Sequence, residues 1–254
     1  MPPISLADWF KTPLGLAVLA REQAVLDDIV ADIFGFHALQ VGLPALPLLR
    51  ASRIPHRMTL AVNALGEAPT SVLALAHEMP FASQSLDLVV LPHVLEFAES
   101  PHAILREVDR VLVPEGRLVL TGFNPLSLWG LRQAADWTRD QHPWDGNFIS
   151  LPRAKDWLTL LGLEVSAGRL WHYGLPVQSE GWRQRFAFLE PAGDRWWGVA
   201  GGVYMLEAIK RVTCVRLIAP RVPARPRRLV AAVPTVRSVS DKVRVLPERV
   251  IRKQ

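Results

Sequence analysis

Polar side chains that could do chemistry follow two apolar stretches of the sequence. His93 and Glu96 come after the run Leu86–Leu91, and Asn124 comes after the run Arg117–Thr121. Histidine and glutamate are side chains that move protons in catalysis, and an asparagine amide can orient a reacting group by hydrogen bonding. Whether these residues act together depends on whether the fold brings the ends of the two stretches side by side.

The segment that joins the two stretches predicts that it does. Leu86–Leu91 consists mostly of Leu and Val, which is typical of a strand buried on both faces. A helix is expected from Pro101 to Leu112, with Ser100 as its N-cap, and Val113–Gly116 then turns the chain into the second strand. Two such strands joined by a helix form a parallel βαβ unit, and ligands of such sheets bind beyond the carboxyl ends of the strands.

A family resemblance is carried by two stretches, MPFASQSLDLVVLPHVLEF (79–97) and SPHAILREVDRVLVPEGRLVLTGFNP (100–125). They resemble the second half of a class I S-adenosylmethionine-dependent methyltransferase of the type 11 group, which reads LPF, SFD, an apolar strand, a helix ending RVLKPGG and a further strand. The resemblance covers about residues 36–125. It implies a doubly wound, mostly parallel seven-stranded α/β sheet of Rossmann-like fold, S-adenosylmethionine as cofactor, and methyl transfer as the reaction.

The resemblance also implies where the cofactor binds. The predicted first strand, His37–Gly42, is followed in the family by a glycine-rich loop, in which Pro44 and Leu46 here replace two of the three glycines. Gly42 either lines the ligand or only turns the chain. The family's cofactor contacts fall on Gln40, Gly42, Leu43, Asn63, Leu75, Ala76 and His93.

Three of these positions lack the acidic side chain that the family has there. Gln40 and Asn63 stand where the family has acidic residues. Asn63 follows a strand expected at Met58–Val62, and the family's acidic residue at this position accepts hydrogen bonds from the ribose hydroxyls. Leu75 stands where an acidic residue binds the adenine amino group, although the backbone of Ala76 could still serve. The resemblance therefore implies either a divergent cofactor pocket or one that has lost its function.

Methyl transfer from a sulfonium needs mainly the positioning of donor and acceptor, and it needs a base only if the acceptor must lose a proton. Glu96 and Asn124 are the substrate-side candidates, with His93 beside them, and no catalytic residue is identified. His93 either belongs to the site or is a hydrogen-bonded surface histidine, and Asn124 either orients an acceptor or makes a turn with Pro125. No His and Cys cluster has the spacing of metal ligands.

The segments around this core have two interpretations each. A helix capped by Thr12 should end near Gly35 and bury an apolar stripe made of Leu16, Leu19, Leu26, Ile29, Val30 and Ile33. It either covers the cofactor or only packs on the sheet. Eight of the nine tryptophans lie between residues 129 and 197, where they form either a lid over the acceptor or anchors for loops. Further elements are expected at Leu151–Leu161 (helix), at Leu163–Val165 and its neighbours (strand), and at Gly201–Arg211 (antiparallel strand).

Composition divides the 254 residues in two. Residues 1–211 are expected to form a methyltransferase-like domain with a core at about 36–125 and a variable cap at about 126–200. Residues 212–254 contain eleven Lys or Arg, two acidic residues and five prolines, which is typical of a flexible basic tail. Such a tail is either solvated or contacts a polyanion such as RNA, DNA or anionic lipid.

The sequence predicts a cytoplasmic protein. Its single cysteine, Cys214, rules out an internal disulfide, and no apolar run approaches the length needed to span a bilayer. The first hypothesis for its function is methylation of a small-molecule or macromolecular acceptor whose identity is unknown. The second is a methyltransferase-like fold that no longer catalyses and serves as a binding or scaffold protein. A third, weaker one is an RNA-associated factor that acts through the basic tail.

Overall fold

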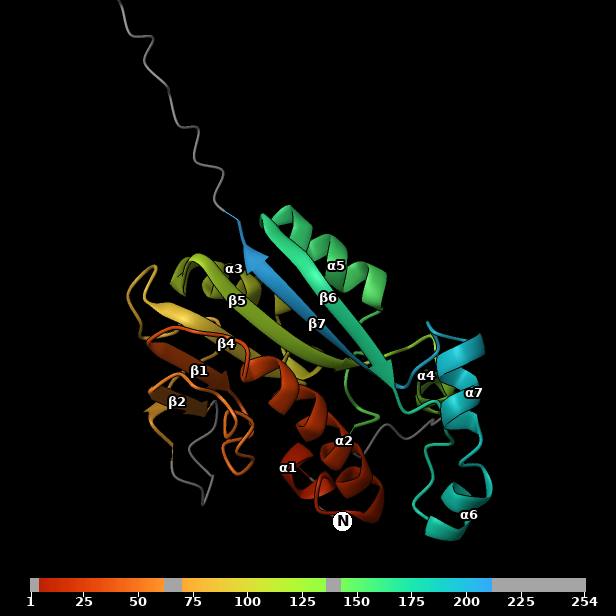
Figure 1. The fold of residues 1–254 in the computed structure, drawn as a ribbon. Coiled ribbons are helices and arrows are strands. Elements are labelled where there is room, and N and C mark those ends of the chain that lie inside the picture. Colours follow the sequence, from red (N-terminus) through yellow and green to blue (C-terminus); the bar gives the residue numbers. More distant parts are fainter. Residues whose placement is uncertain (1–4, 62–69, 136–142, 212–254) are drawn as a thin grey trace, which may run out of the picture. The chain divides into compact units, whose positions relative to one another are not determined.

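Seven strands form one sheet in the order β3-β2-β1-β4-β5-β7-β6 (Figure 1). The computed structural model describes residues 5–61, 70–135 and 143–211, all within the first of two units into which the chain divides, Met1–Thr213 and Cys214–Gln254. The strands are β1 His37–Val41, β2 His56–Ala61, β3 Val72–Leu73, β4 Leu86–Pro92, β5 Leu112–Phe123, β6 Leu163–Trp171 and β7 Val203–Lys210. All neighbouring pairs are parallel except β5–β7 and β6–β7, so the predicted mostly parallel sheet is confirmed.

Helices cover both faces of the sheet (Figure 1). They are α1 Leu6–Trp9, α2 Pro13–Val30, η1 Leu95–Phe97, α3 Pro101–Val111, α4 Leu128–Ala135, α5 Leu151–Leu160, α6 Glu180–Arg185 and α7 Leu189–Trp196. Strand residues alternate between two cores, because successive side chains of a strand point to opposite faces. Val89 of β4 packs with α3 and α5, whereas Leu88 and Val90 pack with α1 and α2.

The βαβ unit predicted from the sequence is present as β4, α3 and β5. The pairing of β4 with β5 passes from Leu86–Leu112 to Leu88–Arg117, so residues 113–116 bulge out of the ladder as the predicted turn. The strand is longer than predicted because Leu112 already pairs with β4. Ser100 precedes α3, but its side chain makes no capping hydrogen bond, which corrects that detail of the prediction.

Helix α2 begins as predicted but ends at Val30, earlier than the predicted end near Gly35. The Thr12 side chain accepts a hydrogen bond from the Gly15 N–H at 3.1 Å, which caps the helix. Most of the predicted stripe is buried, including Leu26, Ile29 and Val30, whereas Leu16 is 54% exposed. Val18 and Glu22 are buried as well. Sequence reasoning missed Glu22, because a glutamate is rarely buried unless it is paired.

The connection from β1 to β2 has an unusual form. Parallel neighbours are generally joined through a helix, but residues 42–55, all of them described, contain only turns. Leu48, Leu49 and Ile54 from this connection are buried against α2. A short irregular segment and the N-terminal helix therefore cover the part of the sheet where a crossover helix would lie.

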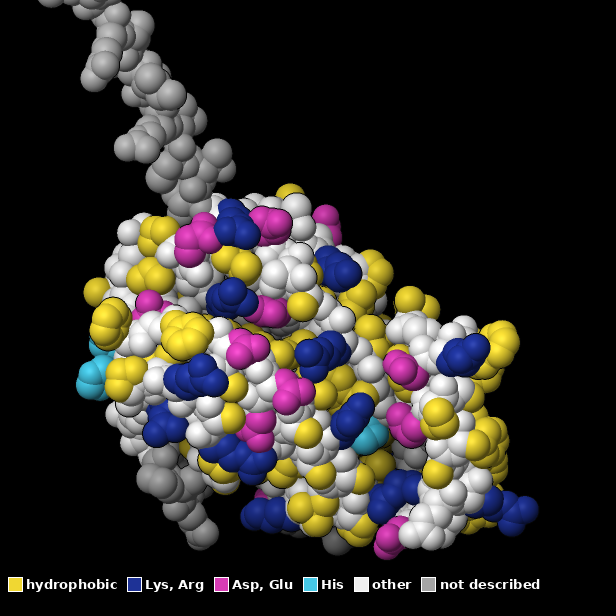
Figure 2. Space-filling model, viewed as in Figure 1, with side chains coloured by type: hydrophobic (Ala, Val, Ile, Leu, Met, Phe, Trp, Pro, Cys, Tyr) yellow, Lys and Arg dark blue, Asp and Glu magenta, His cyan; other side chains and the backbone are white. Residues whose placement is uncertain are grey.

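The tryptophans divide between the two interpretations. Four are buried and anchor loops and helices to the sheet: Trp129, Trp144, Trp157 and Trp171. Three on and after α6 and α7 are more than half exposed, namely Trp182, Trp196 and Trp197. Hydrophobic side chains gather at that side of the molecule in the view of Figure 2, while charges of both signs are interspersed over the rest of that face. Trp137 lies outside the described residues.

Candidate functional site

The strand order reverses between β1 and β4, and that reversal defines the candidate site. The chain leaves β1 toward β2 on one side and later returns to place β4 on the other side. Crevices at such switch points, outside the carboxyl ends of the strands, are where doubly wound sheets bind ligands. Gly42 and Leu43 follow β1 at this edge, His93 follows β4, and Asn124 follows β5.

The Gln40 side chain holds the loop after β1 together through hydrogen bonds to its backbone. Its buried side-chain amide donates to the carbonyls of Leu43 and Leu46, each at 2.9 Å, and to that of Gly42 at 3.2 Å. Its carbonyl oxygen accepts from the Leu48 N–H at 3.2 Å. These bonds fold residues 42–48 without a crossover helix, and contact of Gln40 with a cofactor stays a prediction.

The turn itself presents backbone at the switch point. Gly42 and Leu43 have φ angles of 79° and 46°, a left-handed conformation that glycine adopts without strain and leucine rarely adopts. A Cβ added at Gly42 would meet Val94 Cγ2 at 3.4 Å, which is an ordinary contact. The conformation of Gly42, rather than close packing, is therefore what favours glycine here.

Two exposed leucines lie on and after β3. Leu73 and Leu75 are 59% and 48% exposed, while Ala76 is buried. Asn63, predicted to bind the ribose, lies outside the described residues. Roles for Leu75 and Ala76 at the cofactor therefore stay predictions.

His93 lies between two carboxylates in a fully buried cluster, rather than at the surface. Its Nε2 is 3.3 Å from Glu22 Oε2 of α2, and its Nδ1 is 3.3 Å from Glu96 Oε1 of η1. The rings of Phe123 and Phe10 cover it, with centroids at 4.2 and 5.9 Å. We refer to Glu22, His93 and Glu96 as the buried triad.

The triad holds the imidazole in its charged form. Burial disfavours the charge, but the two carboxylates outweigh it and raise the pKa of His93 to about 10. Burial likewise opposes ionisation of Glu22, whose pKa is nevertheless lowered by the charge of His93 and by hydrogen bonds from His93 and Thr121. The Thr121 hydroxyl donates to Glu22 Oε1 at 2.6 Å.

Glu96 has one satisfied and one unsatisfied oxygen. Oε1 accepts a hydrogen bond from the Phe123 N–H, whereas Oε2 is buried with no partner among the described residues. Burial, and then the negative charge of Glu96, raise the pKa of the Tyr204 phenol well above its ordinary value. The triad therefore sets two carboxyl groups against a single imidazole, and one carboxyl oxygen is left without a hydrogen-bond partner among the described residues.

Asn124 has a structural role in the chain before β7. Its amide nitrogen donates to the carbonyls of Val199 and Gly201, at 2.8 and 3.0 Å, and its oxygen accepts from the Leu126 N–H at 3.0 Å. The side chain is buried. Its contact with an acceptor stays a prediction, as does that of Glu96.

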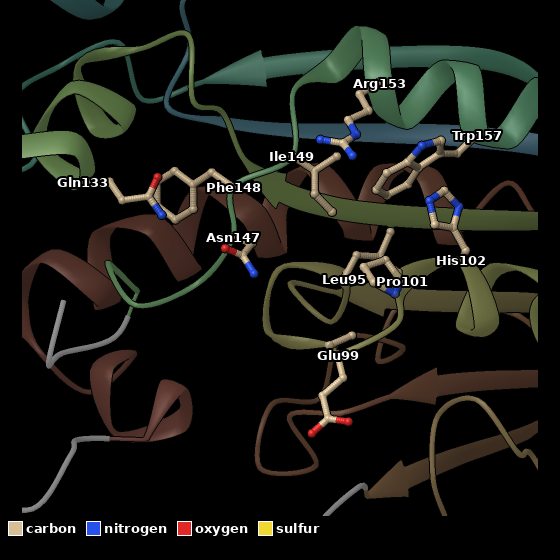
Figure 3. Close-up of a pocket in the computed structure, with 11 residues that line it drawn as sticks. Leu95, Glu99, Pro101, His102, Gln133, Asn147, Phe148, Ile149, Arg153 and Trp157 are labelled. Atoms are coloured by element: carbon tan, nitrogen blue, oxygen red, sulfur yellow. The ribbon is translucent and has the colours of Figure 1, made fainter.

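A pocket of about 430 Å³ lies beside this edge, between the segment after β4 and the segment that enters α5 (Figure 3). Arg153 stacks over the ring of Trp157, with its Cζ 5.1 Å from the ring centroid, and the His102 ring lies 4.1 Å from the same indole. Sequence reasoning missed this pocket because its two walls are about fifty residues apart. Among the described residues no group of three His, Cys, Asp or Glu side chains is placed to hold a metal ion.

Comparisons with known proteins agree with this geometry. A family model described as a methyltransferase domain matches residues 53–120. The uncharacterized protein YafS of Escherichia coli K12 is 34% identical over 174 residues, covering 68% of this chain and 71% of YafS. A malonyl-[acyl-carrier protein] O-methyltransferase of Laribacter hongkongensis is 38% identical over 88 residues, covering 34% of this chain and 30% of that protein.

Solved structures share the fold. A SAM-dependent methyltransferase from Thermotoga maritima superposes with a TM-score of 0.56 at 14% identity, covering 80% of this chain and 93% of that one. The chain therefore belongs to the class I S-adenosylmethionine-dependent methyltransferase family. In the described part of the chain, no helix is both long and apolar enough to cross a membrane.

The residues at the switch point fit S-adenosylmethionine, whose sulfonium is a cation. The unpartnered Glu96 Oε2 is an acceptor that suits a cation nearby, because electrostatic interactions are strong in the poorly solvated interior. The Gly42–Leu43 turn offers backbone groups, and the exposed Leu73 and Leu75 offer apolar surface for a flat ring.

Proposed function

We propose that the chain is an active S-adenosylmethionine-dependent methyltransferase that holds its cofactor along the carboxyl ends of β1, β2 and β4. The observation that carries the proposal is the buried triad, whose unpartnered carboxyl oxygen lies at the carboxyl edge of a methyltransferase sheet. The cofactor, when bound, supplies a methyl group already activated by its positive sulfur.

The residues of this chain would bind and orient. Gly42, Leu43 and Ala76 would contact the cofactor through their backbone, Leu75 through its apolar surface, and Asn63 through its amide. This distribution compensates for the missing acidic residues, because backbone groups serve as hydrogen-bond partners whatever the side chain.

His93 has a supporting role in this proposal. With a pKa of about 10 it is protonated at neutral pH, so it cannot accept a proton from the acceptor there. It holds Glu22 and Glu96 at fixed positions, and Glu96 in turn is bonded to the backbone of Phe123 at the end of β5. Acceleration would come from positioning, which suits acceptors that need no base.

A second function has specific support. The side chains of Gln40 and Asn124 are engaged in internal hydrogen bonds, and the connection after β1 lacks a helix. These features fit a methyltransferase-like protein that binds a partner without catalysis. The division into a domain at 1–211 and a basic tail at 212–254, and contact of that tail with a polyanion, belong to the proposal on composition alone, since the tail lies outside the described residues.

Calorimetric titration with S-adenosylmethionine and S-adenosylhomocysteine tests the proposal. We expect micromolar affinity for S-adenosylmethionine, and loss of that affinity in Gly42→Arg, because the added side chain would fill the turn at the switch point. Gly162→Arg is the matched control: Gly162 has a φ of 76°, close to the 79° of Gly42, but precedes β6 at the opposite edge of the sheet and has open space beside it.

The two glycine variants separate strain from ligand contact. A substitution at either position strains the backbone similarly, so both should lose similar stability. Absence of binding by the folded, unaltered chain at millimolar S-adenosylmethionine would refute the proposed methyltransferase activity and favour the non-catalytic function. Equal loss of affinity in both variants would show that binding does not occur at the Gly42 turn.

A further inference from the structure

The pocket beside the switch point lies where an acceptor would need to lie. Helix α3 follows β4, so it begins at the carboxyl edge of the sheet. Helix α5 ends just before β6, which runs parallel to β5, so α5 also begins at that edge. The pocket lies between the starts of these two helices, and Figure 3 shows its two walls facing each other. Its volume of about 430 Å³ is within the range of small-molecule sites.

Leu95 and Pro101 line one wall, and Ile149 and Arg153 line the other.

Arg153 is the cationic group of this pocket. Its guanidinium stacks on the indole of Trp157, which is only 8% exposed and therefore fixed in position. The His102 ring packs on the same indole. Within the described residues Arg153 makes no hydrogen bond and no ion pair, so the stacked guanidinium is oriented while its N–H donors remain available to a ligand.

The rest of the lining selects among anions. Leu95, Phe148 and Ile149 provide apolar surface beside the guanidinium. Glu99 also lines the pocket, and Figure 3 shows its carboxylate at the end away from Arg153. One guanidinium opposed by one carboxylate suits a monoanion, whereas a phosphate monoester, which carries more negative charge, would be repelled by Glu99 and only partly neutralised.

We propose that this pocket binds the methyl acceptor as a small organic acid, whose carboxylate is held by Arg153 and whose apolar body packs against Leu95, Phe148 and Ile149. That the bound acid is a methyl acceptor rests on the proposed function, but binding of the acid does not require the cofactor. A planar guanidinium pairs with a carboxylate through two parallel hydrogen bonds, which fixes the orientation of the acid as well as its position.

The test measures binding of hexanoate to the full-length chain in the absence of cofactor, by calorimetry and ligand-observed NMR. Hexanamide, a neutral analogue of the same size, and hexyl phosphate are titrated in parallel. We expect hexanoate to bind about tenfold or more tightly than hexanamide, because hydrogen bonds to a charged group are the strong ones. Arg153→Gln should reduce the affinity for hexanoate to that for hexanamide, and Arg153→Lys should give an intermediate affinity.

Arg106→Gln is the matched control, because Arg106 is an exposed arginine of α3 that does not line the pocket. It should leave the affinity for hexanoate unchanged. Equal affinity for hexanoate and hexanamide, tighter binding of hexyl phosphate, an equal loss in both arginine variants, or no saturable binding of hexanoate at millimolar concentration would each overturn the proposal.

Failure of this proposal can be distinguished from failure of the proposed function. Arg153→Gln should keep the affinity of the unaltered chain for S-adenosylmethionine, which also shows that the variant is folded. Binding of hexanoate through Arg153 without binding of S-adenosylmethionine would support the anion pocket and refute the proposed methyltransferase activity.

Discussion

Replacing His93 by glutamine should destabilise the protein strongly, because His93 is the positive member of the buried triad. Glutamine is similar in size but neutral, so Glu22 and Glu96 would remain buried without a charged partner. Removing one partner from a buried ion pair costs about 3–5 kcal/mol. A domain has a free energy of unfolding of roughly 5–15 kcal/mol, so this loss should be visible as a large shift of the denaturation midpoint.

The triad also predicts how stability depends on pH. The pKa of His93 is raised from 6.5 to about 10 in the folded chain, so its contribution is fully present below pH 6.5 and is lost as the pH rises through 10. Each pH unit in that window corresponds to about 1.4 kcal/mol, which gives an upper limit of about 5 kcal/mol. The lowered pKa of Glu22 reports the same interaction and adds nothing to this total.

The assay is guanidinium denaturation between pH 6.5 and pH 10, followed by tryptophan fluorescence, with the free energy of unfolding obtained at each pH. The unaltered chain should lose stability steadily over this range. His93→Gln should lose this part of the slope, and the exposed His56→Gln is the control that should keep it. Adding Glu22→Gln to His93→Gln should restore some stability, because it removes one unpaired buried charge.

Two results would refute this reasoning. A His93→Gln variant destabilised by less than about 1 kcal/mol would place the cluster in a solvated environment, since that is the usual worth of an exposed ion pair. An unchanged pH slope in His93→Gln would mean that other groups cause the dependence on pH.

Two further predictions concern residues that shape the edge of the sheet. Gln40→Leu removes the buried amide that holds residues 42–48 together; it should cost about 2–4 kcal/mol in thermal unfolding and weaken binding of S-adenosylmethionine, and a full-affinity variant would contradict this role. Gly202→Ala should cost about 1–3 kcal/mol and alter the near-ultraviolet dichroism of tryptophan, because the added Cβ would lie 2.2 Å from Trp129 Cδ1. Gly198→Ala, with nothing within 4 Å of its added Cβ, is the control that should change neither.

The βαβ unit could be predicted from the sequence because its signals are local. Apolar runs, helical spacing and a turn all lie within residues 86–123, and each depends on neighbours along the chain. Two charged residues that match the family frame have clear structural roles. Asp87 accepts hydrogen bonds from the Phe36 and His37 N–H groups at 2.8 and 2.9 Å, and Arg110 donates to the Met79 carbonyl at 3.0 Å.

The candidate site depended on contacts between distant segments. Glu22 and His93 are 71 positions apart. Glu22 lies on the buried face of α2, where a charged residue is not expected. The sequence did not predict that the Gln40 amide hydrogen-bonds to the loop after β1. No local pattern encodes these pairings, because each is decided by where the sheet places one element against another.

The sequence by itself determined the class of fold, the family and the parallel βαβ unit whose carboxyl edge is the expected ligand site. Only the tertiary structure decided the charge state of His93, the absence of a helix after β1 and the pocket between α3 and α5. The physical reason is that strand and helix periodicity are properties of consecutive residues, whereas a pKa or a pocket is a property of groups gathered in space. Glu22 and Glu96 keep His93 a cation despite its burial, and the residues next to His93 in the sequence do not predict the contact with Glu22.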